Sequence, residues 1–221
     1  TKVIAERHGL SVYQPEKLKF EEFKNEVPEL DFAVIAAYGK IIPKAILELP
    51  RRGTIGVHPS LLPKYRGPSP IQGAILNGEE QTGGTLFLVD EHIDHGPILV
   101  KKGEEIESND TYKSLHDKLA ILSAELLIEA LTKFMKGEIK PQPQNESDAT
   151  FTKKFTSDDG FIDKKIFQRA LDGTSPEDAK IIWRKVRALN PEPGTWTMIT
   201  TELPFLIRAN RKMIRKRMKI L

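Results

Sequence analysis

The chain has 221 residues with a formal net charge of +3; 39% of its residues are hydrophobic, 29% are charged, and none is cysteine. This composition is typical of a soluble protein of one or two domains, and the lack of cysteine excludes disulfides and thiolate metal sites. No apolar run is long enough to span a bilayer and nothing resembles a signal peptide, so we expect a cytoplasmic protein without membrane contact.

The first part of the chain predicts the beginning of an α/β domain. A helical pattern ends at Gly9, and a short strand at 10–13 and a short helix at 20–27 follow. The uninterrupted apolar run at 31–38 is typical of a central parallel strand that is buried on both faces. A helix is then expected at 43–49, with a proline in its first turn.

A histidine at the end of the next predicted strand indicates a site. A β-branched run at 54–57 leads to His58, and a proline-stiffened loop with a basic turn at 64–67 connects it to a helix at 70–77. Ligands of open α/β sheets lie beyond the carboxyl ends of the strands, and prolines hold such a loop in one geometry. The alternative is a buried structural histidine followed by an ordinary surface loop.

Four side chains that can carry protons or bind metals follow the next predicted strand, at 85–89: Asp90, His92, Asp94 and His95. We expect Asp94 to be the partner of His58, because a carboxylate can orient an imidazole and stabilise its protonated form, as a general base requires. The cluster could also suggest a metal site. Its spacing matches no common zinc pattern, so we predict that no metal is bound.

The order of the predicted elements indicates the fold class. Strands and helices alternate up to residue 89, which predicts a right-handed βαβ succession and a mostly parallel sheet. A long amphipathic helix follows at 111–136, and the segment 140–150 has the proline and polar content of an exposed connector. A serine and a proline then begin another helix at 175–189.

Several segments, in this order, resemble the folate-dependent formyltransferases, especially those that act on methionyl-tRNA. They are AYGKIIPKAILELPRRG at 37–53, HPSLLPKYRGPSPIQGAILNGEEQTG at 58–83 and V-D-E-x-I-D-x-G-P-I-L at 89–99. A fourth, RALNPEPGTWTMI at 187–199, is similar to the start of the C-terminal domain in the methionyl-tRNA members and separates them from the sugar-nucleotide members. The resemblance extends from near residue 1 to about residue 200.

The resemblance implies a domain organisation. It assigns 1–140 to a Rossmann-like formyltransferase domain without its first strand, 141–162 to a linker, and 163–221 to the incomplete start of a C-terminal β-barrel domain that is truncated or divergent. The chain is therefore expected to be incomplete at both ends. A fragment that does not fold stably alone is one alternative, because the loss of a strand exposes one side of a parallel sheet.

The resemblance also implies an activity. Members of this group transfer a formyl group from 10-formyltetrahydrofolate to the amino group of initiator methionyl-tRNA, and we expect a monomeric enzyme. By position, His58 and Asp94 correspond to the catalytic histidine and aspartate. The loop that contacts folate in the family corresponds to four consecutive residues: Ser60, Leu61, Leu62 and Pro63.

One position departs from the family pattern. Gly56 stands where the family has an asparagine that helps to hold and polarise the formyl group. Removal of one such donor typically costs about 100- to 1,000-fold in rate. A catalytically impaired relative that binds folate or tRNA is therefore an alternative, as is an enzyme that formylates a nucleotide-linked amino sugar.

The C-terminal segment at 208–221 is strongly basic, with seven Lys or Arg residues and no acidic residue. Such a segment suits nucleic-acid attraction through phosphate contacts. Its few apolar residues, and the few residues that remain, cannot complete a five-stranded barrel. We favour a truncated or divergent end over a dedicated tRNA-binding arm.

Overall fold

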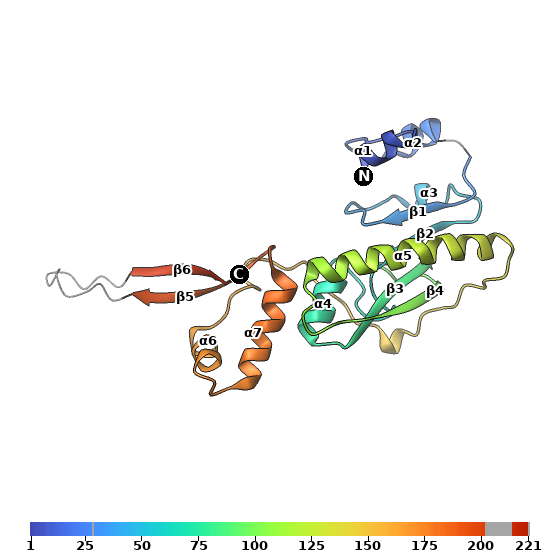
Figure 1. Ribbon diagram of the computed structural model, residues 1–221. Helices are drawn as coiled ribbons and strands as arrows, with labels where there is room; N and C mark the ends of the chain where they lie inside the picture. Colours follow the sequence, from blue (N-terminus) through green and yellow to red (C-terminus); the bar gives the residue numbers. More distant parts are fainter. Residues whose placement is uncertain (28, 202–213, 221) are drawn as a thin grey trace.

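The computed structural model describes residues 1–27, 29–201 and 214–220 (Figure 1). From the N-terminus the elements are α1 (Lys2–Arg7), α2 (Phe20–Glu26), β1 (Ala33–Ala36), α3 (Lys44–Leu47), β2 (Thr54–His58), α4 (Pro70–Asn77), β3 (Gln81–Leu88), β4 (Ile98–Glu105), α5 (Tyr112–Met135), the short 3₁₀ helix η1 (Glu146–Asp148), α6 (Lys164–Leu171), α7 (Pro176–Leu189), β5 (Thr195–Thr201) and β6 (Ile214–Ile220). None of the described helices is both long and apolar enough to cross a membrane.

A four-stranded mixed sheet with the order β1-β2-β3-β4 forms the centre of the fold. Strands β1 and β2 are parallel, whereas β3 is antiparallel to both β2 and β4. The expectation of a mostly parallel sheet is therefore wrong for the described strands. Helix α4 ends at Asn77 and is followed by Gly78, a left-handed residue with φ 70°. Strand β3 begins just after this glycine, near the carboxyl end of β2, so the chain runs back along β2.

Two expectations for the first forty residues are also wrong. Strand β1 lies at the edge of the sheet in the described part of the chain, and its residues alternate between half-buried and exposed, with Val34 42% exposed. The strand expected at 10–13 does not form, and none of the described strands lies beside this segment; Tyr13 instead packs edge-on against Phe23 of α2. Local apolar character predicted both strands but could not identify their neighbours.

The helices follow their local sequence signals closely. Those expected at 20–27, 43–49, 70–77, 111–136 and 175–189 are confirmed as α2, α3, α4, α5 and α7. Thr111 and Ser114 form a reciprocal capping box at the start of α5, and Gly137, with φ 73°, follows its end. Helix α6 was not expected; the side chain of Asp163 caps it by accepting from the Lys165 amide.

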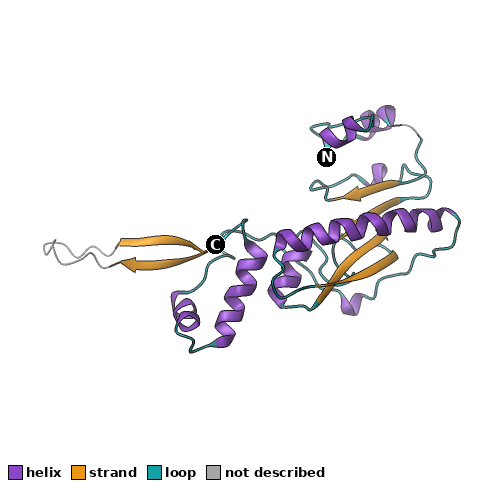
Figure 2. Ribbon diagram, viewed as in Figure 1, coloured by secondary structure: helices purple, strands orange, loops and turns teal. Residues whose placement is uncertain are grey.

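Helix α5 covers one face of the sheet and takes part in two apolar clusters (Figure 2). One cluster joins the sheet to the second half of α5: Ile55, Leu86, Leu99, Leu126 and Ala130. The other joins α4, the first half of α5 and α7: Ile71, Ile75, Leu115, Leu119, Ala188 and Leu189. Helix α7 therefore completes the core around α4 and α5.

The C-terminal strands form a separate two-stranded antiparallel sheet, with Thr195 opposite Ile220 (Figure 1). Of the basic segment 208–221, residues 208–213 and 221 lie outside the described residues, and the structure gives the backbone pairing of β6. The expected β-barrel and the division of the chain at 140 and 162 stay predictions.

Candidate functional site

His58 lies at the carboxyl end of β2 and is 6% exposed. Its Nε2 donates to the backbone oxygen of Tyr65 at 2.9 Å. Because a carbonyl oxygen can only accept, this bond places the ring proton on Nε2 and leaves the lone pair of Nδ1 free in the neutral ring. The loop after β2 therefore folds back to fix the orientation and the tautomer of the imidazole.

Asp94 lies next to the free nitrogen, as the sequence predicted. Its Oδ2 is 3.6 Å from Nδ1 of His58 and accepts a hydrogen bond of 2.7 Å from the Gly67 amide. Asp94 itself has a left-handed backbone, with φ 49°, in the turn between β3 and β4. The structure thus brings together two side chains that are 36 positions apart in the sequence.

The environment of His58 favours a neutral ring. Burial lowers the pKa of His58 below its ordinary value of 6.5, although the charge of Asp94 and the Tyr65 carbonyl both act to raise it. The imidazole is therefore an unprotonated base near neutral pH. When Nδ1 accepts a proton, the carboxylate of Asp94 is in place to stabilise the imidazolium.

The loop at Ser60–Pro63 is tightly fixed to the sheet. The hydroxyl of Thr85 donates to the Ser60 oxygen at 2.6 Å and accepts from the Leu62 amide at 3.1 Å. Ser60 Oγ donates to the Lys64 oxygen at 2.6 Å, so it is not directed at His58 as a nucleophile would be. Ser60 and Leu62 are fully buried, whereas Leu61 and Pro63 are partly exposed.

The structure leaves little space for an asparagine side chain at position 56. A Cβ atom on Gly56 would lie 2.5 Å from Cε1 and 2.6 Å from Cζ of Phe87, and 3.0 Å from Val89 Cγ2. Phe87 is directly opposite Gly56 in the β2–β3 register and is 4% exposed. The sequence analysis did not identify Phe87 as part of the site. The feature that could have indicated it is an aromatic residue in β3, the strand that pairs with the strand of Gly56.

A buried arginine connects the basic turn to the segment after α5. Arg66 is 2% exposed, and its guanidinium donates to both carboxylate oxygens of Glu146, at 2.9 and 2.6 Å. A bidentate pair of this kind fixes geometry as well as charge. The segment 140–150, expected to be an exposed connector, is therefore held to the basic turn by this ion pair.

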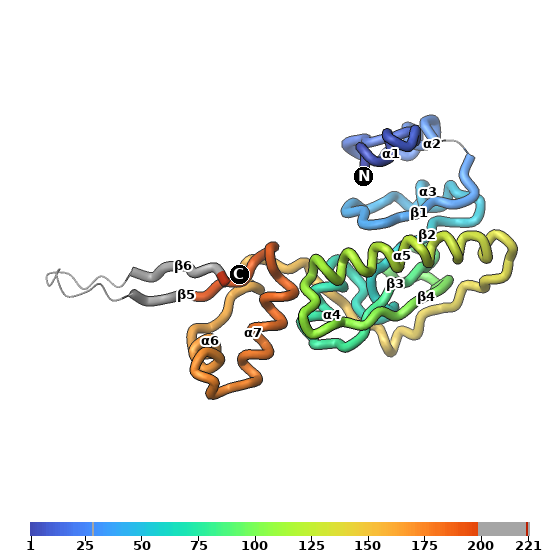
Figure 3. The backbone as a smooth tube through the Cα atoms, in the orientation of Figure 1, coloured from blue at the N-terminus to red at the C-terminus, as the bar shows by residue number. Residues whose placement is uncertain are grey.

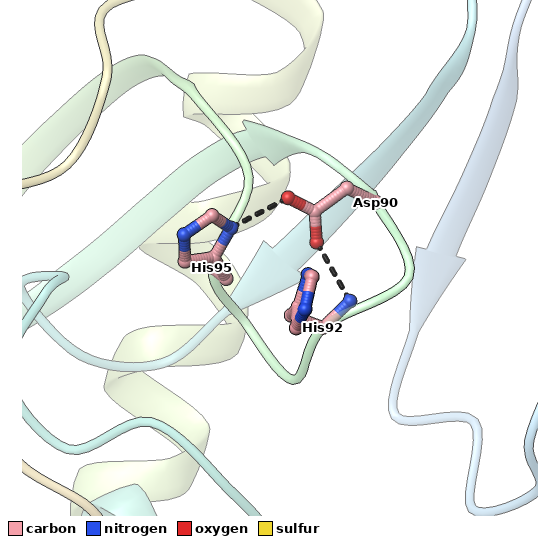
Figure 4. Close-up of side chains that lie close together, drawn as sticks. All are labelled: Asp90, His92 and His95. Carbon is pink, nitrogen blue, oxygen red and sulfur yellow. Dashed lines mark hydrogen bonds and ion pairs between the residues drawn. The ribbon is translucent and has the colours of Figure 1, made fainter.

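A cavity of about 580 Å³ lies beside the turn that carries Asp94, between residues 44–54 and 88–95. Figure 4 shows three side chains of that turn: His95 Nδ1 bonds Asp90 Oδ2 at 2.6 Å, and Asp90 Oδ1 accepts from the His92 amide at 2.9 Å. Their ligand atoms lie within 4.8 Å of one another, so this group could hold a metal ion. The expectation that no metal is bound stays a prediction.

Comparison with protein families and curated proteins identifies relatives. The family described as formyl transferase matches residues 1–131. The methionyl-tRNA formyltransferase of Halorhodospira halophila is 44% identical over 195 residues, which are 87% of this chain and 59% of that protein. That of Thermodesulfovibrio yellowstonii is 42% identical over 219 residues, 91% of this chain and 70% of that protein. The chain thus spans about three fifths to seven tenths of the length of these two relatives.

Solved structures share the fold at lower identity. A variant of HypX from Aquifex aeolicus has a TM-score of 0.68 and 23% identity, over 86% of this chain and 31% of that chain. HypX in complex with tetrahydrofolic acid has a TM-score of 0.64 and 24% identity, over 81% and 29%. A 4-N formyltransferase from Francisella tularensis has a TM-score of 0.64 and 17% identity, over 89% and 75%.

The structural likeness supports a Rossmann-like α/β fold with a mixed sheet, and the family match covers the elements that carry His58 and Asp94. The relative that is 42% identical is itself covered to 70%. On these two matches, this chain belongs to the formyl transferase family.

Proposed function

We propose that this chain catalyses formyl transfer from 10-formyltetrahydrofolate to the amino group of initiator methionyl-tRNA. The observation that carries the proposal is a buried, neutral His58 whose free Nδ1 faces the carboxylate of Asp94. Relatives that are 42% to 44% identical carry the name methionyl-tRNA formyltransferase. The sugar-modifying alternative has weaker support, from a Mycobacterium tuberculosis structure described as a likely sugar N-formyltransferase, which is 22% identical and speaks for the fold alone.

His58 acts as the general base in this proposal. The amino nitrogen forms a bond to the formyl carbon, and its proton passes to Nδ1 of His58. The bond between the formyl carbon and the folate nitrogen then breaks, and His58 returns the proton to that nitrogen. Asp94 stabilises the charged ring between these two steps, and the transfer needs no covalent enzyme intermediate.

We infer that the folate donor lies at the loop Ser60–Pro63, next to the His58–Asp94 pair. The cavity of about 580 Å³ is lined by residues within 44–54 and by 88–92 and His95, and by none of these site residues, so we do not assign it to the donor. In the loop after β2, Leu61 and Pro63 are partly exposed and are the members available for contact with the donor.

The remaining expectations become part of the proposal. We infer a monomer in the cytoplasm that binds tRNA, with a catalytic unit at 1–140, a linker at 141–162 and the start of a C-terminal unit at 163–221. The resemblance of 187–199 to methionyl-tRNA members supports this division.

A catalytically impaired relative is the second candidate, and one observation favours it. Gly56 supplies no side-chain amide to polarise the formyl group, and the ring of Phe87 lies where a Cβ at this position would be, so an asparagine would need that ring to shift. This candidate predicts folate binding without transfer.

The test is a formyl-transfer assay with 10-formyltetrahydrofolate and either methionyl-tRNA or a nucleotide-linked amino sugar. We expect transfer to methionyl-tRNA, and a loss of about 100- to 10,000-fold in His58→Ala. His116→Ala is the matched control, because His116 is exposed on α5 and its described side-chain contacts are with Asp117 and Tyr112. Folate binding without transfer to either acceptor would favour the impaired relative, and transfer to the sugar alone would refute the methionyl-tRNA proposal.

A further inference from the structure

The basic turn after the histidine holds both members of the His58–Asp94 pair. The backbone oxygen of Tyr65 accepts from His58, and the backbone amide of Gly67 donates to Asp94. The residue between them, Arg66, points its buried side chain at the segment that follows α5. The relative position of imidazole and carboxylate therefore depends on how firmly this turn is held against the turn that carries Asp94.

One side chain of that segment contacts both turns. Gln144 Oε1 accepts from Nε of Arg66 at 3.2 Å and from its Nη2 at 2.9 Å. Its Nε2 donates to the backbone oxygens of Asp94, at 2.9 Å, and Gly96, at 2.8 Å. A primary amide has one accepting oxygen and two donating hydrogens, so all its capacity for donation is used here.

Backbone hydrogen bonds on both sides of Gln144 hold the main chain in place, and this fixes the position from which the Gln144 side chain extends. Gln142 forms two backbone bonds with Ile98 of β4, at 2.7 and 2.8 Å. Further along, the Thr150 oxygen accepts from the Arg66 amide at 2.8 Å. Figure 3 shows this part of the chain running back from the end of α5 along β4 toward α6.

We propose that Gln144 is a positioning residue for the reaction of the His58–Asp94 pair, and the inference of a catalytic effect rests on the proposed function. Its amide joins the turn that holds the imidazole to the backbone of the turn that carries the carboxylate. The segment at 140–150, expected to be a connector, is thus part of the framework of the site. Small displacements of reacting groups are costly, of the order of 100-fold in rate for about 1 Å.

The test is Gln144→Glu, with Gln142→Glu as the matched control. A glutamate at 144 keeps an oxygen for Arg66 but, when ionised, cannot donate to the Asp94 and Gly96 oxygens. Gln142 lies in the same segment and is exposed, and its side chain bonds the Lys140 oxygen. Both variants add one negative charge, so their difference isolates the contacts of Gln144.

In the formyl-transfer assay, we expect Gln144→Glu to lower kcat by about 100-fold while the KM values for both substrates stay unchanged. We also expect hydrogen exchange at the Gly67 amide, whose acceptor is Asp94, to become about tenfold faster without any substrate present. Gln142→Glu should leave kcat and the exchange rate at wild-type values. Gln144→Met, which matches the shape and adds no charge, should reproduce both effects if Gln144→Glu does not fold.

The two measurements separate this inference from the proposed function. If the wild-type chain transfers no formyl group but Gly67 exchange is still faster in Gln144→Glu than in the wild type, the positioning contact is supported and the proposed function is rejected. Unchanged exchange and unchanged kcat in the folded Gln144 variants would overturn the inference while formyl transfer stands. A rise in KM with constant kcat would also overturn it, because such a change reports substrate binding and not the arrangement of the pair.

Discussion

His58 combines three features that a general base needs: burial, a fixed tautomer and a nearby carboxylate. The desolvation of the ring and the charge of Asp94 act on its pKa in opposite directions, and desolvation is the larger effect. The ring of His58 is therefore unprotonated at neutral pH and can accept a proton. The free energy that Asp94 contributes appears only after the proton has moved, which is the stage at which catalysis benefits.

The acid side of the pH–rate profile should reflect this balance. We expect kcat/KM for formyl transfer to fall only below pH 6.5, the ordinary pKa of histidine, because burial lowers the pKa of His58. Asp94→Asn should move that limb to still lower pH and reduce the plateau, since the charge of the carboxylate is the larger of the two effects that raise the pKa of His58. Rates measured from about pH 5 to 8 provide the check. An acid limb at or above pH 6.5 would contradict the assignment of His58.

The same shift links His58 to stability. In the unfolded chain the ring takes up a proton near pH 6.5, before it does so in the folded chain. Between the two pKa values the unfolded state binds more protons, so the free energy of unfolding rises with pH there. The contribution of His58 is therefore complete above pH 6.5 and is lost as the pH falls through the folded-state pKa.

Because Phe87 packs against Gly56, restoring the family asparagine at position 56 should reduce the stability of the fold. We expect Gly56→Asn alone to destabilise the fold by about 1 to 3 kcal/mol, because the new Cβ would lie 2.5 Å from the Phe87 ring in a packed interior. Chemical denaturation measures this loss. Gly39→Asn is the matched control, since a Cβ at Gly39 would have no atom within 4 Å.

A second substitution tests whether the Phe87 ring is the cause of this loss of stability. Phe87→Val in the Gly56→Asn background should recover most of the lost stability, because it removes the ring that occupies the space. If Gly56→Asn alone is as stable as the wild type, Phe87 moves aside readily and the lack of space at position 56 does not limit the site.

At the scale of elements, the sequence predicted helices better than strand pairing. The extents of α4 and α5 are set by local features, namely a proline at the start and a left-handed glycine after the end of α4, and a capping box at Thr111. Strand direction is a non-local property. The apolar run that became β1 looks central by composition, yet its position at the sheet edge depends on which strands pair with it.

The residues of the candidate site also fall into those that local sequence could predict and those that depend on distant contacts. His58 and Asp94 could be predicted because both follow strands and match a family motif, and the structure brings them together. Phe87, Arg66 and Gln144 could not, because their importance arises from contacts across the sheet or over long sequence separations. Side-chain hydrogen bonds between segments about 80 residues apart, such as Arg66 with Glu146, leave no periodic trace in the sequence.

At the scale of the whole molecule, α7 is packed as part of the catalytic unit although it follows the proposed linker. Ala188 and Leu189 at its end have no exposed surface and share a cluster with Ile71 of α4 and Leu115 of α5. Close packing of this kind transmits the stability of one element to its neighbours. The segment around α7 therefore contributes to the support of the loop and helix that follow His58.

Leu189→Ala tests whether this packing makes one cooperative unit. We expect the free energy of unfolding of the whole catalytic unit to fall by about 2 to 5 kcal/mol, because a fully buried leucine leaves a cavity shared by α4, α5 and α7. Leu171→Ala on α6 is the control, since Leu171 is 66% exposed and should change stability little. Denaturant unfolding measures the loss of stability, and hydrogen exchange at the Leu115 amide reports on α5 directly. If Leu189→Ala unfolds α7 while the protection of Leu115 stays at the wild-type value, α7 is an independent unit; if both fall together, the catalytic fold extends through residue 189.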